Sequence, residues 1–131
     1  MPSRRTWPAA LAVVLVAFGL LAAPALSSRA PTKAEKKAIT HAFKTTKIAQ
    51  LNKVAYKFDV VKIRVSTVNS HWARASFDAK PKYRSTFQNG YGVAKKGKHG
   101  WKGADVGSSG VGCGKVPKKV IKDLKLGPCP G

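Results

Sequence analysis

The sequence predicts an α+β protein, in which an N-terminal helix packs on an antiparallel sheet of about four strands and a short C-terminal helix is clipped by a disulfide. Three observations lead to this fold class. An apolar stripe at helical spacing begins near residue 32, alternating segments occupy residues 60–106, and a second helical stretch lies between two cysteines. Elements grouped in this order are typical of α+β domains.

Residues 1–25 are expected to be a signal peptide. Two arginines precede an apolar run over residues 9–23, and Ala23-Pro24-Ala25 fits the small-x-small pattern before a cleavage site. We expect cleavage after this tripeptide, with Ser27 or Ser28 as alternative sites. An uncleaved anchor helix remains an alternative interpretation, because the apolar segment has about the length that crosses a bilayer. Cleavage would make the protein secreted and extracellular.

A linker over residues 26–31 is expected to precede the first helix. Thr32-Lys33-Ala34-Glu35 is a capping-box pattern, in which the Thr hydroxyl and the Glu carboxylate satisfy free N–H groups at a helix start. The residues that follow separate onto two faces at helical spacing. The expected apolar face carries Ala34, Ala38, Ile39, Ala42 and Phe43. The expected outer face carries Lys33, Lys36, Lys37, Thr40 and Lys44. Residues 45–59 favour a short helical turn followed by the start of a strand.

The first predicted hairpin spans residues 60–79. Apolar and polar side chains alternate over residues 60–67 and again over residues 72–79. The link Asn69-Ser70-His71 supplies turn chemistry, and two alternating runs joined so closely form an antiparallel pair. On the buried face of its first strand we expect Val61, Ile63, Val65 and Thr67.

A second hairpin is expected over residues 90–95 and 101–106, turned through residues 96–100. We expect the complete sheet to be covered on one face. A Gly/Ser-rich stretch over residues 107–114 then leads to a short helix that opens at Pro117, because proline suits the first helical position.

Cys113 and Cys129 are the two cysteines of the chain. An isolated pair in an exported chain is expected to form a disulfide. A redox pair or two metal ligands are the alternatives. A redox pair usually has Cys-x-x-Cys spacing, and a zinc site needs further ligands close by. We expect no metal and no cofactor.

The chain of 131 residues is too short for a large enzyme, a solenoid or a multi-span membrane protein, and its formal net charge is +20. Lysine supplies most of this charge, and the arginines beyond residue 25 are Arg29, Arg64, Arg74 and Arg84. Lysine is a hydrated point charge, whereas arginine suits bidentate recognition. The composition favours a monomer that is attracted to an anionic polymer or surface, such as cell wall, anionic lipid or nucleic acid.

The densest cationic stretch covers residues 95–102, with Tyr91 and Trp101 beside its lysines. Basic charge next to aromatic rings is typical of surfaces that bind polyanions and single strands. The polyanion-binding residues are predicted to be Lys95, Lys96, Lys98, Trp101 and Lys102. The alternative is a solvated hairpin tip in which the tryptophan is buried.

No residue is expected to be catalytic, because the five carboxylates and three histidines are scattered along the chain. The stretch over residues 107–115 fits neither a nucleophile elbow nor a phosphate loop. One alternative function is a small secreted hydrolase such as a ribonuclease, which would need His71 and His99 to meet across the sheet. Another is a protein-partner or inhibitor module, in which a rigid hairpin tip beside the disulfide docks into a groove.

The ending Cys-Gly-x-Val-Pro…Asp-Leu…Cys-Pro is the most specific motif of the chain and begins at Cys113. With Val65-Ser66-Thr67-Val68 and Trp72-Ala73, it resembles small secreted proteins of uncharacterised function predicted in actinobacteria. The likeness covers roughly residues 32–131. It implies export, one disulfide and a single small α+β domain over those residues, and it brings no catalytic residue. The high lysine content departs from the more arginine-rich sequences of that group.

Overall fold

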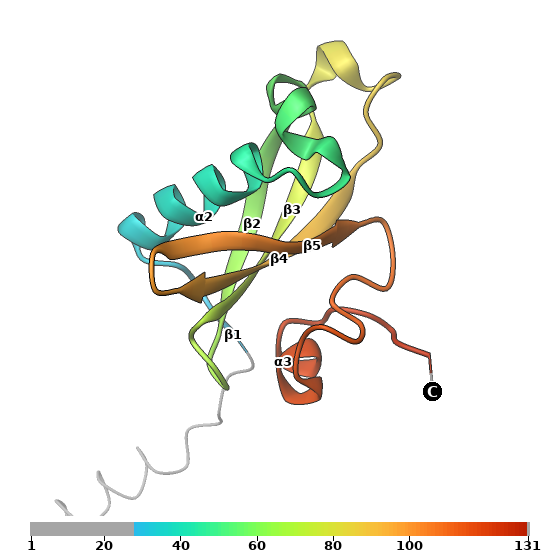
Figure 1. Ribbon diagram of the computed structural model, residues 1–131. Helices are drawn as coiled ribbons and strands as arrows, with labels where there is room; N and C mark the ends of the chain where they lie inside the picture. The colour runs from blue at the N-terminus through green and yellow to red at the C-terminus, as the bar shows by residue number, and fades with distance from the viewer. Residues whose placement is uncertain (1–27, 131) are drawn as a thin grey trace, which may run out of the picture.

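The computed structural model describes residues 28–130 and contains a five-stranded antiparallel sheet of order β1-β2-β3-β4-β5 (Figure 1). The strands are β1 (Ser28–Arg29), β2 (Phe58–Ser66), β3 (Trp72–Ala79), β4 (Gly90–Gly97) and β5 (Gly100–Gly107). The helices are α2 (Lys33–Thr45), the 3-10 segments η2 (Ile48–Lys57) and η3 (Pro81–Tyr83), and α3 (Lys118–Asp123). The predicted α+β class is confirmed, with a short first strand added to the expected sheet.

Strand β1 lies where a linker was expected. Ser28 pairs with Ser66 and Arg29 pairs with Val65 of β2. The expected signal peptide lies outside the described residues. Within residues 28–130, no helix combines the length and the apolar character that crossing a membrane requires.

Helix α2 begins with the predicted capping box. The Thr32 hydroxyl accepts a hydrogen bond from the Glu35 N–H at 3.1 Å, and the Glu35 carboxylate accepts one from the Thr32 N–H at 2.9 Å. Arg29 donates to both carboxylate oxygens of Glu35, at 2.7 and 2.8 Å. The buried residues of the helix are Ile39, Ala42 and Phe43. Ala34 is exposed, so the buried stripe is narrower than predicted.

Lys44 does not lie on the solvent face of α2, where it was expected. Its ammonium donates to the carbonyl of Ala55 at 2.6 Å and to that of Phe58, and it lies 4.3 Å from the centroid of the Phe58 ring. Burial lowers the pKa of the Lys44 amine, and the charge of Lys80 lowers this pKa further. Lys44 therefore joins α2 to the start of β2.

Strand β2 contains a bulge that the alternating pattern did not predict. Its pairing with β3 shifts between Val61 and Arg64, and Lys62 has φ 52°. An extra residue in one strand interrupts the alternation of side chains, so two residues that would share a face across this point lie on opposite faces. Ile63 and Val65 are accordingly buried in the core, whereas Val61 is half-buried and Thr67 is exposed beyond the strand.

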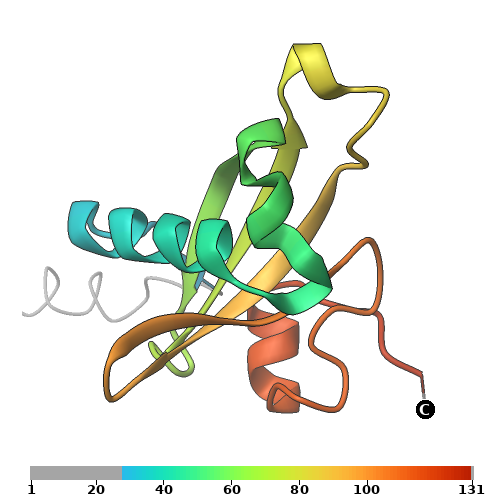
Figure 2. The same ribbon diagram turned by 45° about the horizontal axis from the view of Figure 1, so that its top comes forward.

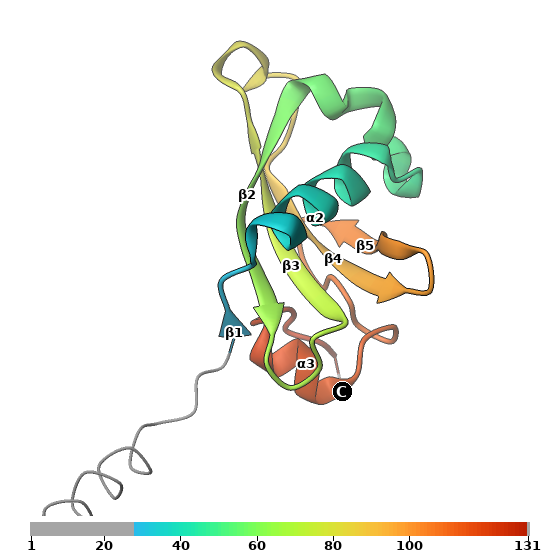
Figure 3. The same cartoon turned by 90° about the vertical axis from the view of Figure 1, so that its left-hand side faces the viewer.

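The sheet is covered on both faces, so the expectation of a single covered face was wrong. Adjacent residues of β3 lie in different clusters, with Ala73 under α2 and η2 and Trp72 under α3. Figures 2 and 3 show α2 and α3 at separate positions on the sheet. The first cluster contains Ile39, Phe43, Leu51, Phe58, Ile63, Val65, Ala73, Ala75, Phe77 and Ala94. The second contains Trp72, Val93, Val111, Val116, Val120, Leu124 and Leu126.

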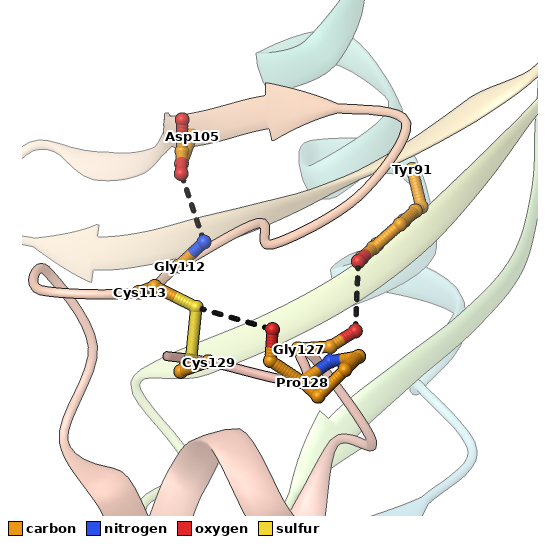
Figure 4. The surroundings of a disulfide bond; sticks show 7 residues. All are labelled: Tyr91, Asp105, Gly112, Cys113, Gly127, Pro128 and Cys129. Carbon is orange, nitrogen blue, oxygen red and sulfur yellow. Dashed lines mark hydrogen bonds between the residues drawn. A yellow bond between two sulfur atoms is a disulfide. The ribbon is translucent and has the colours of Figure 1, made fainter. Parts of the chain in front are cut away.

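The predicted disulfide is confirmed. Cys113 and Cys129 are joined, with their Cα atoms 5.6 Å apart (Figure 4). Hydrogen bonds hold the same segment to the sheet, since the Gly112 N–H donates to Asp105 at 2.8 Å and the Tyr91 hydroxyl donates to the Gly127 carbonyl at 3.3 Å. Structural disulfides of this kind form in oxidising compartments.

Candidate polyanion-binding hairpin

The predicted site lies on the hairpin formed by β4 and β5. Its register pairs Lys95 with Lys102, Lys96 with Trp101 and Gly97 with Gly100, which leaves Lys98-His99 as a two-residue turn. The strands therefore run further than predicted, because the turn does not begin until residue 98. Gly100, directly after the turn, has φ 105°, a left-handed conformation that glycine adopts without steric cost.

The register divides the predicted site residues between the two faces of the hairpin. Cross-strand partners share a face, and successive residues of a strand alternate. Lys95 and Lys102 therefore share one face with Trp72, which pairs with Lys95 from β3. The Lys95 ammonium lies 5.3 Å from the centroid of the Trp72 ring. Lys96 and Trp101 lie on the opposite face.

The Trp101 side chain contributes to the core. Its side chain is half-buried and packs against the first cluster, under α2. Lys95, Lys96, Lys98 and Lys102 are all exposed. The exposed lysines agree with the polyanion-binding interpretation. The partial burial of Trp101 agrees with the solvated-tip interpretation.

An open hollow lies on the hairpin tip. It has a volume of about 290 Å³, and its charged or titratable lining residues are Lys95, Lys98, His99 and Lys102. The backbone of Gly97, Gly100 and Gly103 forms much of the remaining wall. Side chains with mobile ammonium groups around such a hollow can contact several anionic oxygens at once.

Three of the five carboxylates among the described residues form ion pairs with residues outside the hairpin tip. Ion pairs join Glu35 to Arg29 at 2.7 Å, Asp59 to Lys80 at 3.9 Å and Asp105 to Lys115 at 3.6 Å. Within residues 28–130, no ion pair neutralises a lysine of the hairpin tip. The tip therefore carries an uncompensated positive charge.

His71 and His99 are exposed at separate turns, as their sequence neighbours predict. The backbone carbonyl of His71 accepts a hydrogen bond from the Lys96 N–H at 2.7 Å, so this turn lies against β4. Across residues 28–130, no group of three or more His, Cys, Asp or Glu side chains could hold a metal ion. These positions give the ribonuclease alternative no specific support.

The hairpin tip does not lie beside the disulfide. Tyr91 and Asp105, which contact the disulfide-linked segment, lie near the opposite end of the hairpin from the Lys98-His99 turn (Figure 4). The geometry assumed for the inhibitor alternative was therefore wrong. The reason is that the C-terminal segment covers the sheet instead of reaching the tip.

Sequence reasoning missed a second group of aromatic and cationic side chains, in η2 and η3. Tyr56-Lys57 and Lys82-Tyr83 lie 25 or more residues apart in the chain, and the two tyrosine rings are in contact, with centroids 5.3 Å apart. The available signal was an aromatic residue adjacent to a lysine in each segment. Neither segment had a predicted position on the sheet.

Comparison with protein-family models, with curated proteins and with solved structures finds no match to this chain.

Proposed function

We propose that this chain is a secreted, non-catalytic basic domain that associates with anionic polymers or surfaces through the tip of the β4–β5 hairpin. The observation that carries the proposal is the arrangement of Lys95, Lys98 and Lys102 around one open hollow, without a carboxylate partner in the described part of the chain. Lysine ammonium groups suit an irregular set of anionic oxygens, because they do not impose the planar geometry of arginine.

The mechanism is electrostatic attraction with release of counterions. Binding through about four to six anionic groups gives a log–log dependence of affinity on salt with a slope of about −3 to −5. Sequence preference on a nucleic acid should be weak at this tip, because base recognition needs side chains directed at base edges.

The test is a salt titration of binding to polyphosphate, which offers regular phosphates and no bases. Replacing Lys95, Lys98 and Lys102 together by Gln should make the slope shallower by about 2–3, at ~0.7–0.9 per lost contact. The matched control replaces three exposed lysines of α2, and it contains Lys33→Gln, Lys36→Gln and Lys37→Gln. Lys44 is left out of the control because it bonds two backbone carbonyls.

The control variant should keep a steeper slope than the hairpin variant, although both lose the same charge. Equal slopes in the two variants would mean that charge acts diffusely and that the hairpin is not a site. Absence of polyphosphate binding at low salt would reject the proposal as a whole.

Export through residues 1–25 is part of the proposal, and β1 supports a cleavage site upstream of Ser28. Arg64 donates to the Ser28 hydroxyl at 3.0 Å and to the Ser28 carbonyl at 2.6 Å. Cleavage after Ala25 preserves these contacts, whereas cleavage after Ser28 removes them. N-terminal sequencing of the protein from culture medium should begin at Leu26. An intact N-terminus in the membrane fraction would support the anchor instead.

A further inference from the structure

Tyr56 is an exposed aromatic residue that neither core cluster includes. It exposes 58% of its surface, and its ring meets the half-buried Tyr83 edge to face, with 5.3 Å between centroids and 85° between ring planes. The contact brings η2 and η3 together and fixes the Tyr56 ring without covering it. A ring that is held in place and open to solvent can serve as a stacking platform.

Two ammonium groups border these rings. The Lys57 ammonium lies 5.9 Å from the Tyr56 centroid and 6.0 Å from the Tyr83 centroid, and the Lys82 ammonium lies 5.7 Å from the Tyr83 centroid. The exposed Asp59 nearby forms an ion pair with Lys80. Within residues 28–130, neither Lys57 nor Lys82 forms an ion pair with a carboxylate. Both lysines therefore remain available to anionic groups beside the aromatic pair.

We propose that Tyr56, Tyr83, Lys57 and Lys82 form a tyrosine–lysine surface that binds single-stranded nucleic acid, with an unpaired base stacked on Tyr56 and flanking phosphates at the lysines. Surfaces that bind single strands combine aromatic rings for bases with cations for the backbone. In a duplex the faces of the bases are already stacked, so a single strand is the form that can use the ring.

The chemistry of the surface favours a nucleic acid over a membrane. Among the described residues, the exposed large apolar side chains are Tyr56 and Val68, and Val68 belongs to the β2–β3 turn. One tyrosine offers little apolar area to a bilayer, whereas one ring is sufficient to stack on one base. A polyanion without bases would leave the ring unused.

The tyrosine–lysine surface is separate from the hairpin tip. Figure 1 shows η2 in green and η3 in yellow at the upper end of the molecule, whereas the β4–β5 hairpin extends to the left. Figure 3 shows η3 in yellow at the top of the molecule and the β4–β5 hairpin in orange at a lower level. Variants of the two surfaces can therefore be compared in one binding assay. The two proposals involve different residues and have in common only that a basic domain attracts polyanions.

The test compares the full chain's affinity for a short oligothymidine and for an abasic oligodeoxynucleotide of equal length and charge. Oligothymidine should bind about 5- to 150-fold more tightly, which is the effect of one stacked base. Tyr56→Ala should remove this preference and leave abasic binding unchanged. Tyr56→Phe keeps the ring and should keep the preference. Val68→Ala is the matched control, because it shortens the other exposed apolar side chain and should change neither affinity.

Equal affinity of the unmodified protein for the two oligonucleotides would overturn the inference, as would a Tyr56→Ala variant that keeps the preference. The hairpin variant separates the two proposals. It should weaken binding of both oligonucleotides by a similar factor and leave their ratio unchanged. Absence of a base preference in the unmodified protein, with intact, hairpin-dependent polyphosphate binding, would reject this inference and leave the proposed function in place.

Discussion

The hydroxyl of Ser66 at the end of β2 donates a hydrogen bond to the carboxylate of Asp123 on α3, with Oγ and Oδ2 2.6 Å apart. Both residues are buried. The same carboxylate oxygen accepts from the N–H groups of Thr67 and Val68, at 2.9 and 3.4 Å. A buried carboxylate needs such donors because burial removes its hydrogen bonds to water. The contact joins the last helix to the first hairpin.

The Ser66–Asp123 contact should contribute measurably to stability. Asp123→Asn places an amide against N–H donors and should lower the free energy of unfolding by about 2–4 kcal/mol. Ser66→Ala removes the hydroxyl that donates to Asp123 and accepts from the Val68 and Asn69 N–H groups, and it should cost about 1–3 kcal/mol. The double variant should lose less than the sum, because the residues share one network. Urea unfolding measures these losses. Asp78→Asn, at an exposed carboxylate, is the control, and strictly additive losses would contradict the coupling.

Glu35 predicts a pH dependence of stability. The Arg29 hydrogen bond lowers the pKa of this carboxyl from 4.5 to about 2. Because the folded-state pKa lies below the unfolded one, the contribution to stability is complete above about pH 4.5 and is lost as the pH falls through 2. Glu35→Gln should therefore lower the free energy of unfolding by about 1 kcal/mol at pH 7. The difference from the unmodified protein should shrink towards pH 2, and a difference independent of pH would contradict this origin.

The disulfide should stabilise the segment that covers the second face of the sheet. Its cysteines are 16 residues apart, and closing a loop of this size contributes about 3 kcal/mol in the chain-entropy model. Replacing Cys113 and Cys129 together by Ser should lower the urea midpoint accordingly. Amide hydrogen exchange should accelerate around Val116 and Val120 more than in β2 and β3. A thiol titration of the native protein should find no free thiol, and two thiols per chain would contradict the bond.

Gly92 occupies a position where two phenylalanine rings leave no room for a methyl group. A Cβ there would lie 2.7 Å from Cε1 of Phe43 and 2.8 Å from Cζ of Phe77. Gly92→Ala should destabilise the protein by about 1–3 kcal/mol through overpacking. Gly97→Ala is a matched control on the same strand, because the nearest atom to its Cβ would be 4.0 Å away. Calorimetry should show a lower melting temperature for the first variant alone.

The parts of the fold that could be predicted are those determined by contacts between residues close together in the sequence. The Thr32–Glu35 capping box acts across three positions, and the turn at Asn69-Ser70-His71 joins adjacent strands. The second layer on the sheet could not be predicted in this way. Trp72 and Val93 form that layer only because Val120 and Leu124 reach them from the end of the chain. Periodicity along one strand does not show which distant segment will cover it.

The same limit applies to the candidate site. The lysines of the hairpin were identified from their density along the chain, but their division between two faces depends on the pairing of Lys95 with Lys102. Lys44 does not lie on the predicted solvent face of α2, because its ammonium donates to carbonyls of η2 and β2. The contact of Tyr56 with Tyr83 joins two segments whose positions were not predicted. In each case the missing information was a contact between elements.

The pairing of Lys95 with Lys102 places two like charges directly opposite each other in the sheet. Such cross-strand pairs are destabilising. The hairpin therefore bears a repulsion that an anion bound at these two lysines would relieve, so ligand binding and folding are thermodynamically linked. Polyphosphate should accordingly raise the melting temperature of the native domain. A Lys102→Gln variant, which removes the repulsion and keeps the Lys95–Trp72 contact, should be more stable than the native domain without ligand and gain less from its addition.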